Sequence, residues 1–308
     1  MSRIASGLDF VDVKFLGYPQ IIATAILHGP GGVALVDPGP SSTLPALRAA
    51  LQERGIGPGD IRTILLTHIH LDHAGSTGTL VRELPHATVY VHARGAVHMV
   101  DPSKLLDSAK RLYGADMDRL WGEFLAVPET NVRALKGGEA IEAGGRTLEV
   151  AYTPGHASHH VCYFDRSSGV AFTGDVTGIR RGSGRYVMPP TPPPDIDLEL
   201  WQQSLDRVMT WSPDTLFITH FGPWQGSRAH VEEIRDRLMD WGRRAKAVLD
   251  RADLDADAQC AEFVRQITED LRRHLPADEV EFYERAGRSD YSWHGLARYW
   301  RKRAAPPP

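Results

Sequence analysis

The sequence predicts an α/β fold, in which short buried strands alternate with amphipathic helices. Two observations support this prediction. Short apolar runs that are partly β-branched, such as residues 33–36 and 64–66, are too brief for helices and are bounded by turn residues. Between such runs lie stretches with apolar side chains three and four positions apart, as at Leu44, Leu47 and Leu51.

The elements of the first half are expected in a simple order. Two strands, at 11–16 and 20–27, flank a turn, and a third at 33–36 ends in Asp37-Pro38-Gly39-Pro40. A helix at 44–54 follows, which Ser41 or Ser42 can cap. The remaining elements of this half are a strand at 64–66, a helix through 80–84 and a strand at 88–91.

Composition is that of a soluble enzyme rather than a nucleic-acid-binding protein. The 308 residues are 42% hydrophobic and 24% charged, with a formal charge of -4. The two cysteines, Cys162 and Cys260, make no disulfide framework and are expected to be packing residues in a reducing compartment. The N-terminus lacks an apolar signal core, and no stretch has the length of a membrane span. The expected location is the cytoplasm, without membrane or nucleic-acid partners.

The most informative segment follows the strand at 64–66. It places His68, His70, Asp72 and His73 within six residues, in the spacing H-x-H-x-D-H, although the chain has only 14 histidines. Imidazole and carboxylate groups are the ligands of zinc and similar cations. Neighbouring side chains on a tight loop point to different sides, so this run can serve two cations.

Three later strands also stop at a potential ligand. His156 follows the strand at 148–152, Asp175 the strand at 170–172 and His220 the strand at 216–218. Taken singly, these residues also fit a turn histidine, a helix cap and a core histidine. Together with the first motif they predict one metal site at one sheet edge, where α/β proteins bind ligands.

In order and local setting, these seven residues resemble the metallo-β-lactamase superfamily of metallohydrolases over roughly residues 20–225. The resemblance implies a four-layer αβ/βα sandwich of two mixed β-sheets with outer helices. It further implies that His68, His70 and His156 hold one metal, that Asp72, His73 and His220 hold another, and that Asp175 bridges them. Zinc is the expected metal, and manganese or iron can occupy the same ligands. Asp175 stands where some true β-lactamases have Cys, which argues against antibiotic hydrolysis.

The implied activity is a metal-dependent hydrolysis of a small molecule. A hydroxide bridging two cations would cleave an ester-like bond (thioester, lactone or phosphoester), and Asp72 would carry the proton to the leaving group. Two alternatives stay open: a mononuclear iron persulfide dioxygenase of the same superfamily, and a non-catalytic scaffold stabilised by its metals. Ser158, His159 and His160 do not form a persuasive triad, and we expect loop packing, with either histidine able to line the pocket.

Two segments are expected to wall the pocket within a catalytic domain at 1–225. The first is a helical insertion at 101–127, whose Tyr113, Met117, Trp121 and Phe124 can face the substrate or simply pack on the core. The second is the loop at 177–194. In it, Arg180 or Arg181 is expected to meet an anionic group and Tyr186 a carbonyl, with solvated arginines as the alternative.

Two further interpretations concern Asp37 and the C-terminal part. Asp37 ends a strand in the pattern V-D-P-G and either orients a ligating imidazole or is only a turn residue. Residues 226–308 form a helical extension, with helices expected at 231–249, 256–275 and 278–285. Hydroxyacylglutathione hydrolases (glyoxalase II) carry a similar appendage, but their glutathione-binding basic residues have no clear match here. A layer that closes the pocket or forms a homodimer is the alternative.

Overall fold

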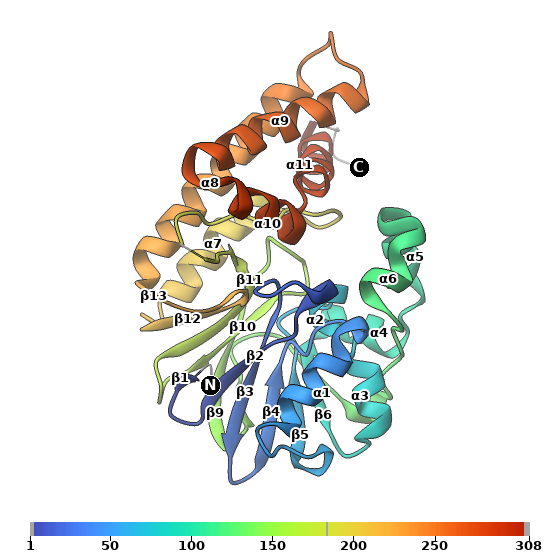
Figure 1. The fold of residues 1–308 in the computed structure, drawn as a ribbon, viewed down its shortest axis with the longest axis vertical. Coiled ribbons are helices and arrows are strands. Elements are labelled where there is room, and N and C mark those ends of the chain that lie inside the picture. The colour runs from blue at the N-terminus through green and yellow to red at the C-terminus, as the bar shows by residue number, and fades with distance from the viewer. Residues whose placement is uncertain (1–2, 183, 305–308) are drawn as a thin grey trace.

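The computed structural model describes residues 3–182 and 184–304. It contains two β-sheets packed face to face, with helices on their outer sides and a helical layer at the C-terminal end (Figure 1). Strand order is β1-β2-β3-β4-β5-β6-β7 in the first sheet and β13-β12-β11-β10-β9-β8 in the second. Both sheets contain parallel and antiparallel pairs. The expected sandwich of two mixed sheets with C-terminal helices is confirmed.

The first sheet and the helices between its strands come from the N-terminal part of the chain. Its strands are β1 Arg3–Ala5, β2 Leu8–Asp12, β3 Ala23–Gly29, β4 Gly32–Val36, β5 Ile61–Leu65, β6 Thr88–His92 and β7 Val132–Leu135. The helices are α1 Leu44–Gln52, α2 Leu71–Ala74, α3 Thr77–Glu83, α4 Ala93–Val100, α5 Ser103–Tyr113 and α6 Met117–Trp121.

The second sheet and the C-terminal helices follow. The strands are β8 Ala140–Ala143, β9 Arg146–Tyr152, β10 Val161–Asp165, β11 Val170–Ile179, β12 Thr215–His220 and β13 Gly222–Gln225. The helices are α7 Leu198–Met209, α8 Ser227–Leu249, α9 Ala256–His274, α10 Ala277–Gly287 and α11 Ser289–Ala304. The boundary expected at 225 falls just before α8.

Apolar side chains from both sheets fill the space between them. Leu27 and Val36 of the first sheet and Tyr163, Phe172 and Phe217 of the second are buried in one cluster. Such strand interiors, buried on both sides, explain the continuous apolar runs in the sequence. The two sheets therefore form a rigid support for the loops at their edges.

Two local predictions were wrong, and one helix was missed. The strand expected through residue 16 ends at Asp12, because that carboxylate accepts backbone N–H groups of Lys14 and Gln20 and fixes a loop. Neither Ser41 nor Ser42 caps α1, since their hydroxyls donate to carbonyls of other segments. Helix α11 was not predicted.

The C-terminal helices pack onto the sandwich through an apolar face. Ile234, Leu238 and Trp241 of α8 are buried in the same cluster as Trp201 and Leu205 of α7. Helix α11 contacts both α8 and α9. Helices α5 and α6, which belong to the expected insertion, stand opposite α10 and α11 (Figure 1). In the described part of the chain, no helix is long and apolar enough to cross a membrane.

Candidate metal centre

The seven predicted ligands come together at one edge of the sandwich. His68 and His70 lie on the loop after β5, and the short helix α2 presents Asp72 and His73 in its only turn. The other three ligands come from the second sheet. His156 lies on the loop between β9 and β10, Asp175 in β11 and His220 at the end of β12.

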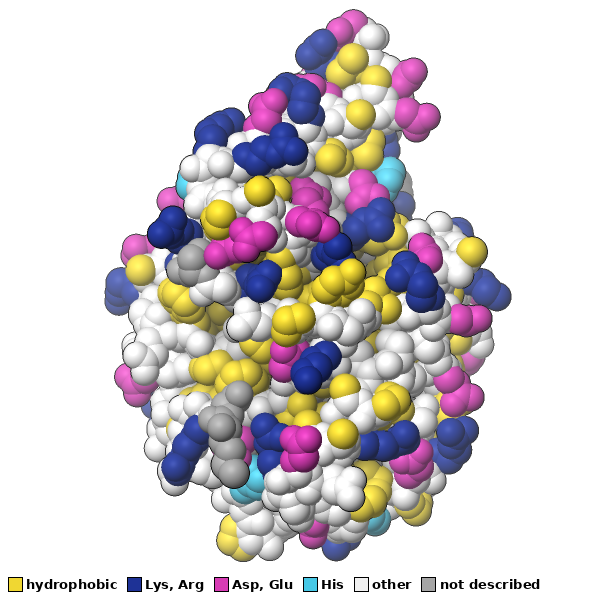
Figure 2. Space-filling model, viewed as in Figure 1, with side chains coloured by type: hydrophobic (Ala, Val, Ile, Leu, Met, Phe, Trp, Pro, Cys, Tyr) yellow, Lys and Arg dark blue, Asp and Glu magenta, His cyan; other side chains and the backbone are white. Residues whose placement is uncertain are grey.

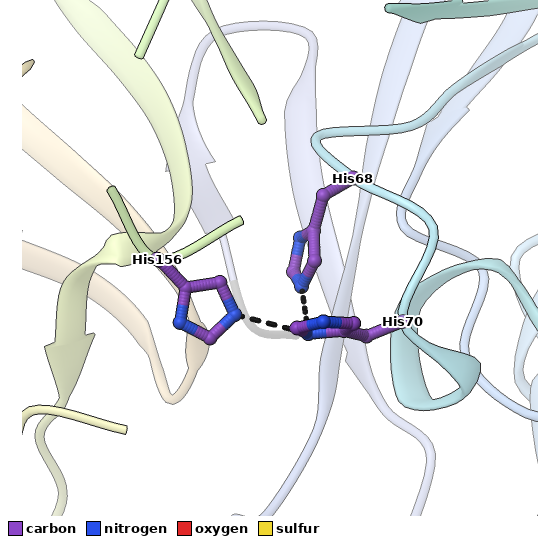
Figure 3. A group of neighbouring side chains, drawn as sticks. All are labelled: His68, His70 and His156. Carbon is purple, nitrogen blue, oxygen red and sulfur yellow. Dashed lines mark hydrogen bonds between the residues drawn. The ribbon is translucent and has the colours of Figure 1, made fainter. Parts of the chain in front are cut away.

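Three imidazoles form the first group of donors (Figure 3). The Nδ1 atom of His70 lies 3.0 Å from Nε2 of His68 and 3.0 Å from Nε2 of His156. His68 and His156 are buried, while His70 reaches the cavity described below. Three ring nitrogens pointing to one place is the arrangement that holds a zinc-like cation.

Asp72, His73 and His220 form the second group. The Oδ2 atom of Asp72 lies 3.3 Å from Nε2 of His220 and 3.7 Å from Nε2 of His73. Asp175 lies between the two groups. Its Oδ1 is 3.1 Å from Nε2 of His73, and its Oδ2 is 3.4 Å from Nε2 of His156. This carboxylate is therefore placed to contact a cation in either group.

Hydrogen bonds on the outer ring nitrogens fix the orientation of four histidines. A ring whose Nδ1–H donates outward keeps the Nε2 lone pair for a cation. The Nδ1 partners are Thr67 Oγ1 for His68 at 3.1 Å, Asp37 Oδ2 for His73 at 2.8 Å, Pro190 O for His156 at 2.9 Å and Ile21 O for His220 at 2.7 Å.

The buried carboxylate of Asp37 accepts four hydrogen bonds from residues at or next to the predicted ligands. Its Oδ2 accepts hydrogen bonds from His73, from the Thr67 hydroxyl at 2.7 Å and from the Thr219 hydroxyl at 2.9 Å, while Oδ1 accepts the Thr67 N–H at 2.8 Å. The residue is fully buried and has a positive φ of 50°. Asp37 therefore holds the His73 imidazole in one orientation, and that this imidazole ligates a metal stays a prediction.

Charges within the centre shift the pKa values in opposite directions. Burial and the neighbouring His73 lower the pKa of His68 well below its usual value, so its imidazole is neutral. Burial opposes ionisation of Asp72, but the nearby His73 and His220 outweigh it and lower the carboxyl pKa to about 2. Despite its burial, the pKa of His73 is raised because the Asp175, Asp72 and Asp37 carboxylates surround it.

Two buried atoms support the presence of a cation. The Nε2 of His73 and the Oδ1 of Asp175 are buried and face each other at 3.1 Å, but neither makes a hydrogen bond of acceptable geometry among the described residues. Buried polar atoms are rarely left in this state. A cation between them would satisfy both and take the place of the proton that the carboxylates attract to His73. The residues present therefore fit a metal centre.

The centre opens into a cavity of about 1160 Å³. Its floor includes His70, Asp72, Asp175 and His220. The insertion supplies one wall and the C-terminal helices another, and the predicted ligands lie on the floor between them. Figure 2 shows the surface hollowed between these two parts of the molecule. Of the residues predicted to contact substrate, Trp121 lies in the wall.

The structure corrects the expected positions of the two arginines and the tyrosine of the 177–194 loop. Arg180 Nη1 lies 3.2 Å from Oε2 of Glu233, and the guanidinium of Arg181 stacks on Phe282. Tyr186 is fully buried, and its hydroxyl donates to Asp270 at 2.8 Å. These side chains hold the loop to α8, α9 and α10, whose partner groups lie some 50 to 100 residues away in sequence. Residue 183 of this loop lies outside the described residues.

Phe124 and the histidines after His156 also do not line the cavity. Phe124 packs partly buried against the core. His159 Nδ1 accepts the N–H of Ile69 at 3.4 Å, and His160 Nε2 accepts the N–H of Asp175 at 3.3 Å. Both rings thus support ligand-bearing segments, in agreement with loop packing.

Sequence reasoning missed the cavity residues of α11. Tyr291, His294 and Arg298 line the cavity from this helix. Their spacing of three and four positions marks one helical face and was the available signal. It was overlooked because the helix itself was not predicted.

Comparisons with known proteins agree with this geometry. The family model described as the metallo-beta-lactamase superfamily matches residues 18–220. A metallo-beta-lactamase fold-containing protein of Sulfurisphaera tokodaii is 27% identical over 220 residues, which are 70% of this chain and 78% of that protein. The crystal structure of a metallo-beta-lactamase family protein from Thermus thermophilus has a TM-score of 0.71 and 26% identity, covering 97% of this chain and 95% of the other.

Two relatives that match over a smaller share of their own length carry the names of thioester hydrolases. A hydroxyacylglutathione hydrolase of a Synechococcus strain is 32% identical over 162 residues, which are 52% of this chain and 50% of that protein. An atrochrysone carboxyl ACP thioesterase of Aspergillus fumigatus is 24% identical over 225 residues, 72% of this chain and 59% of the relative. The chain thus spans only about half the length of these relatives. With the family model covering most of the chain and all seven ligand positions filled, the protein belongs to the metallo-beta-lactamase superfamily.

Proposed function

We propose that this protein is a hydrolase with two metal ions that cleaves an ester-type bond, with thioesters as the favoured class. The observation that carries the proposal is the pair of donor groups joined by Asp175 on the floor of a large cavity. Two divalent cations at such a centre supply a hydroxide nucleophile near neutral pH and polarise a carbonyl or phosphoryl oxygen.

The side chains of the chain itself contribute orientation and proton transfer. Four imidazoles are locked by hydrogen bonds on Nδ1, so they need no reorganisation when a cation binds. The Asp72 side chain is 25% exposed and reaches the cavity, whereas that of Asp175 is 6% exposed. We therefore assign to Asp72 a proton relay, in which its carboxylate accepts a proton from the attacking water and passes it to the leaving group.

Two considerations favour a thioester. The relatives named as hydroxyacylglutathione hydrolase and as acyl carrier protein thioesterase both act, by their names, on thioesters. A thiolate is also a weaker base than an alkoxide, so a thioester depends less on the proton that Asp72 is proposed to transfer. The second donor group distinguishes this proposal from a mononuclear iron dioxygenase, which would need only one.

The test combines metal analysis with substrate screening. The protein is stripped of metal, reloaded separately with zinc, manganese or iron, and measured for bound metal by elemental analysis. Each form is then assayed with thioesters, lactones, oxygen esters and phosphotriesters. We expect two equivalents of metal and hydrolysis of at least one thioester.

A matched control separates damage at the centre from general damage. The Asp175→Asn variant should lose both metal binding and activity. Asp165 is also a buried carboxylate, bonded to Arg146 and Ser167, but it lies away from the centre, so Asp165→Asn should keep both. A single equivalent of iron, with oxygen consumption on glutathione persulfide and no hydrolysis, would replace the proposal by the dioxygenase.

A further inference from the structure

The two sides of the cavity differ in chemistry. The side formed by the N-terminal loop and the insertion is mostly apolar, with Phe15, Ile22, Leu105, Leu112, Tyr113 and Trp121 among its lining residues, and its charged side chains are Arg111 and Arg119. The aromatic rings there contact one another directly. Phe15 stacks on Trp121 at a centroid distance of 5.5 Å, and Tyr113 meets Trp121 edge-on at 5.0 Å. This wall is thus preorganised to bind an apolar group.

The other side, formed by α10 and α11, is polar and carries basic groups. Tyr291, His294 and Arg298 lie on one face of α11, three and four residues apart, and all line the cavity. The guanidinium of Arg298 makes one hydrogen bond, from Nε to the carbonyl of Pro194 at 3.3 Å. In the described structure, no carboxylate lies within ion-pair distance of Arg298 or of the opposing Arg111 on α5.

Most other charges of the cavity rim are already compensated. Arg285 pairs with Glu281, and Arg288 pairs with Asp290 at 2.6 Å. Arg119 pairs with Asp116 at 3.0 Å, whereas Glu284 in the described structure accepts only uncharged groups, among them the hydroxyls of Ser289 at 2.9 Å and Thr268 at 3.2 Å, and keeps its negative charge. The rim therefore offers an anion two guanidinium groups, those of Arg111 and Arg298, and the nearby imidazole of His294. Lysine and arginine side chains are visible around the hollow, with hydrophobic side chains within it (Figure 2).

The two sides meet above the metal ligands. The Tyr113 ring of α5 contacts the Tyr291 ring of α11 edge-on at 5.5 Å. The floor between them carries Asp72 and His220. A substrate that reaches this floor can therefore contact the apolar wall and the basic face of α11 at once. The volume of about 1160 Å³ leaves room for groups on both sides of the cleaved bond.

We propose, resting on the hydrolase function proposed above, that the substrate is an amphiphilic anion. An apolar acyl group lies against Tyr113 and Trp121, and the thiol part of the thioester carries a carboxylate or phosphate that Arg298 and Arg111 bind. The chemistry is balanced as a hydrolysis: water adds to the acyl carbon, the carbon–sulfur bond breaks, and the thiol leaves with a proton.

The test uses three compounds that share a hexyl chain and differ in charge. S-hexyl-pantetheine is neutral, S-hexyl-4'-phosphopantetheine carries a phosphate and S-hexyl-glutathione carries carboxylates. These thioethers are not hydrolysed, so calorimetric binding to the zinc-loaded protein does not depend on activity. We expect one anionic compound to bind about 10-fold more tightly than the neutral one, as a charge-assisted contact predicts. Which anion binds identifies the source of the charge.

Variants test the residues separately. Arg298→Gln and Arg111→Gln should each remove much of the preference for the anion and leave binding of S-hexyl-pantetheine unchanged. Arg301→Gln, on the same helix but outside the cavity lining, should change neither. Trp121→Ala should reduce the binding affinity of all three S-hexyl compounds by roughly 10- to 200-fold, measured relative to the corresponding S-methyl compounds, which lack the apolar chain.

The outcomes separate this inference from the proposed function. If the wild type binds the neutral and both anionic thioethers with equal affinity, the inference about the anion is overturned. The same holds if Arg298→Gln reduces the affinity for all three compounds by the same factor. Selective binding of an anion without hydrolysis of the matching thioester would support the inference about the ligand while refuting the hydrolase.

Discussion

Replacing Asp37 by asparagine tests whether the buried carboxylate beneath the centre holds the ligands in place. Asn has the same shape, but one of its two terminal groups is a donor. If the amide nitrogen took the position of Oδ2, the donors of Thr67, His73 and Thr219 would lose their acceptor. If it took the position of Oδ1, it would face the N–H of Thr67. Every orientation thus leaves at least one buried donor unpaired.

The size of the effect follows from these contacts. An unpaired buried donor costs about 1–3 kcal/mol in the free energy of unfolding. Loss of a carboxylate that supports a ligating histidine reduces metal affinity by roughly 10- to 100-fold. For Asp37→Asn we expect both effects, because the same Oδ2 atom serves the fold and His73.

The assay is zinc competition against a chromophoric chelator, with urea unfolding of the metal-free protein measured in parallel. Asp165→Asn is the control, because that buried carboxylate also accepts several hydrogen bonds but lies at the far end of β10 from the ligands. It should lower stability and leave zinc affinity unchanged. If Asp37→Asn bound zinc within twofold of the wild type, the positioning role of Asp37 would be refuted.

Three further predictions concern the centre and its surroundings. Gly174→Ala should abolish metal binding, because the added Cβ would lie 2.5 Å from the Thr67 hydroxyl oxygen. Gly55 is the control: it also has a positive φ, but a Cβ there would meet no neighbour, so Gly55→Ala should bind metal like the wild type. Asp72→Asn should lower turnover more than about 100-fold while circular dichroism stays unchanged, since a ligand matters more than its supporting partner; near-normal turnover would remove Asp72 from the mechanism. Burial lowers the pKa of His230 to about 4, below its unfolded value, so its stabilising contribution is present above about pH 6.5 and is lost as the pH falls toward 4. The wild type should therefore lose up to ~3 kcal/mol more than His230→Gln between pH 7 and pH 4 in urea unfolding, and parallel pH profiles would refute this assignment.

The convergence of the seven predicted ligands was predictable because its signals are local. His68, His70, Asp72 and His73 stand within six residues, and the other ligands each end or interrupt a short apolar strand. The strands fix where those residues emerge, so convergence at one edge follows from the α/β pattern. Asp37 could be recognised for the same reason, since it ends β4, next to β5 in the sheet.

The cavity walls were only partly predictable because their contacts are long-range. Proximity to Asp175 in sequence suggested that Tyr186 faces the substrate, but Asp270 of α9 takes its hydroxyl away from the centre. The sequence does not reveal such a partner 84 residues away. Conversely, Arg298 belongs to the cavity only because α11 folds back over it.

Ligands and walls are coupled at two backbone positions. The carbonyl of Ile21 accepts the Nδ1–H of His220, and the carbonyl of Pro190 accepts that of His156, while both residues also line the cavity. Changes in α5 or α11 can alter which substrate fits without touching these carbonyls. A change that shifts the backbone at residue 21 or 190 would instead rotate a ligating imidazole. Evolution of a new specificity in this protein is therefore least constrained in the two helical additions, and most constrained where wall and ligand share a residue.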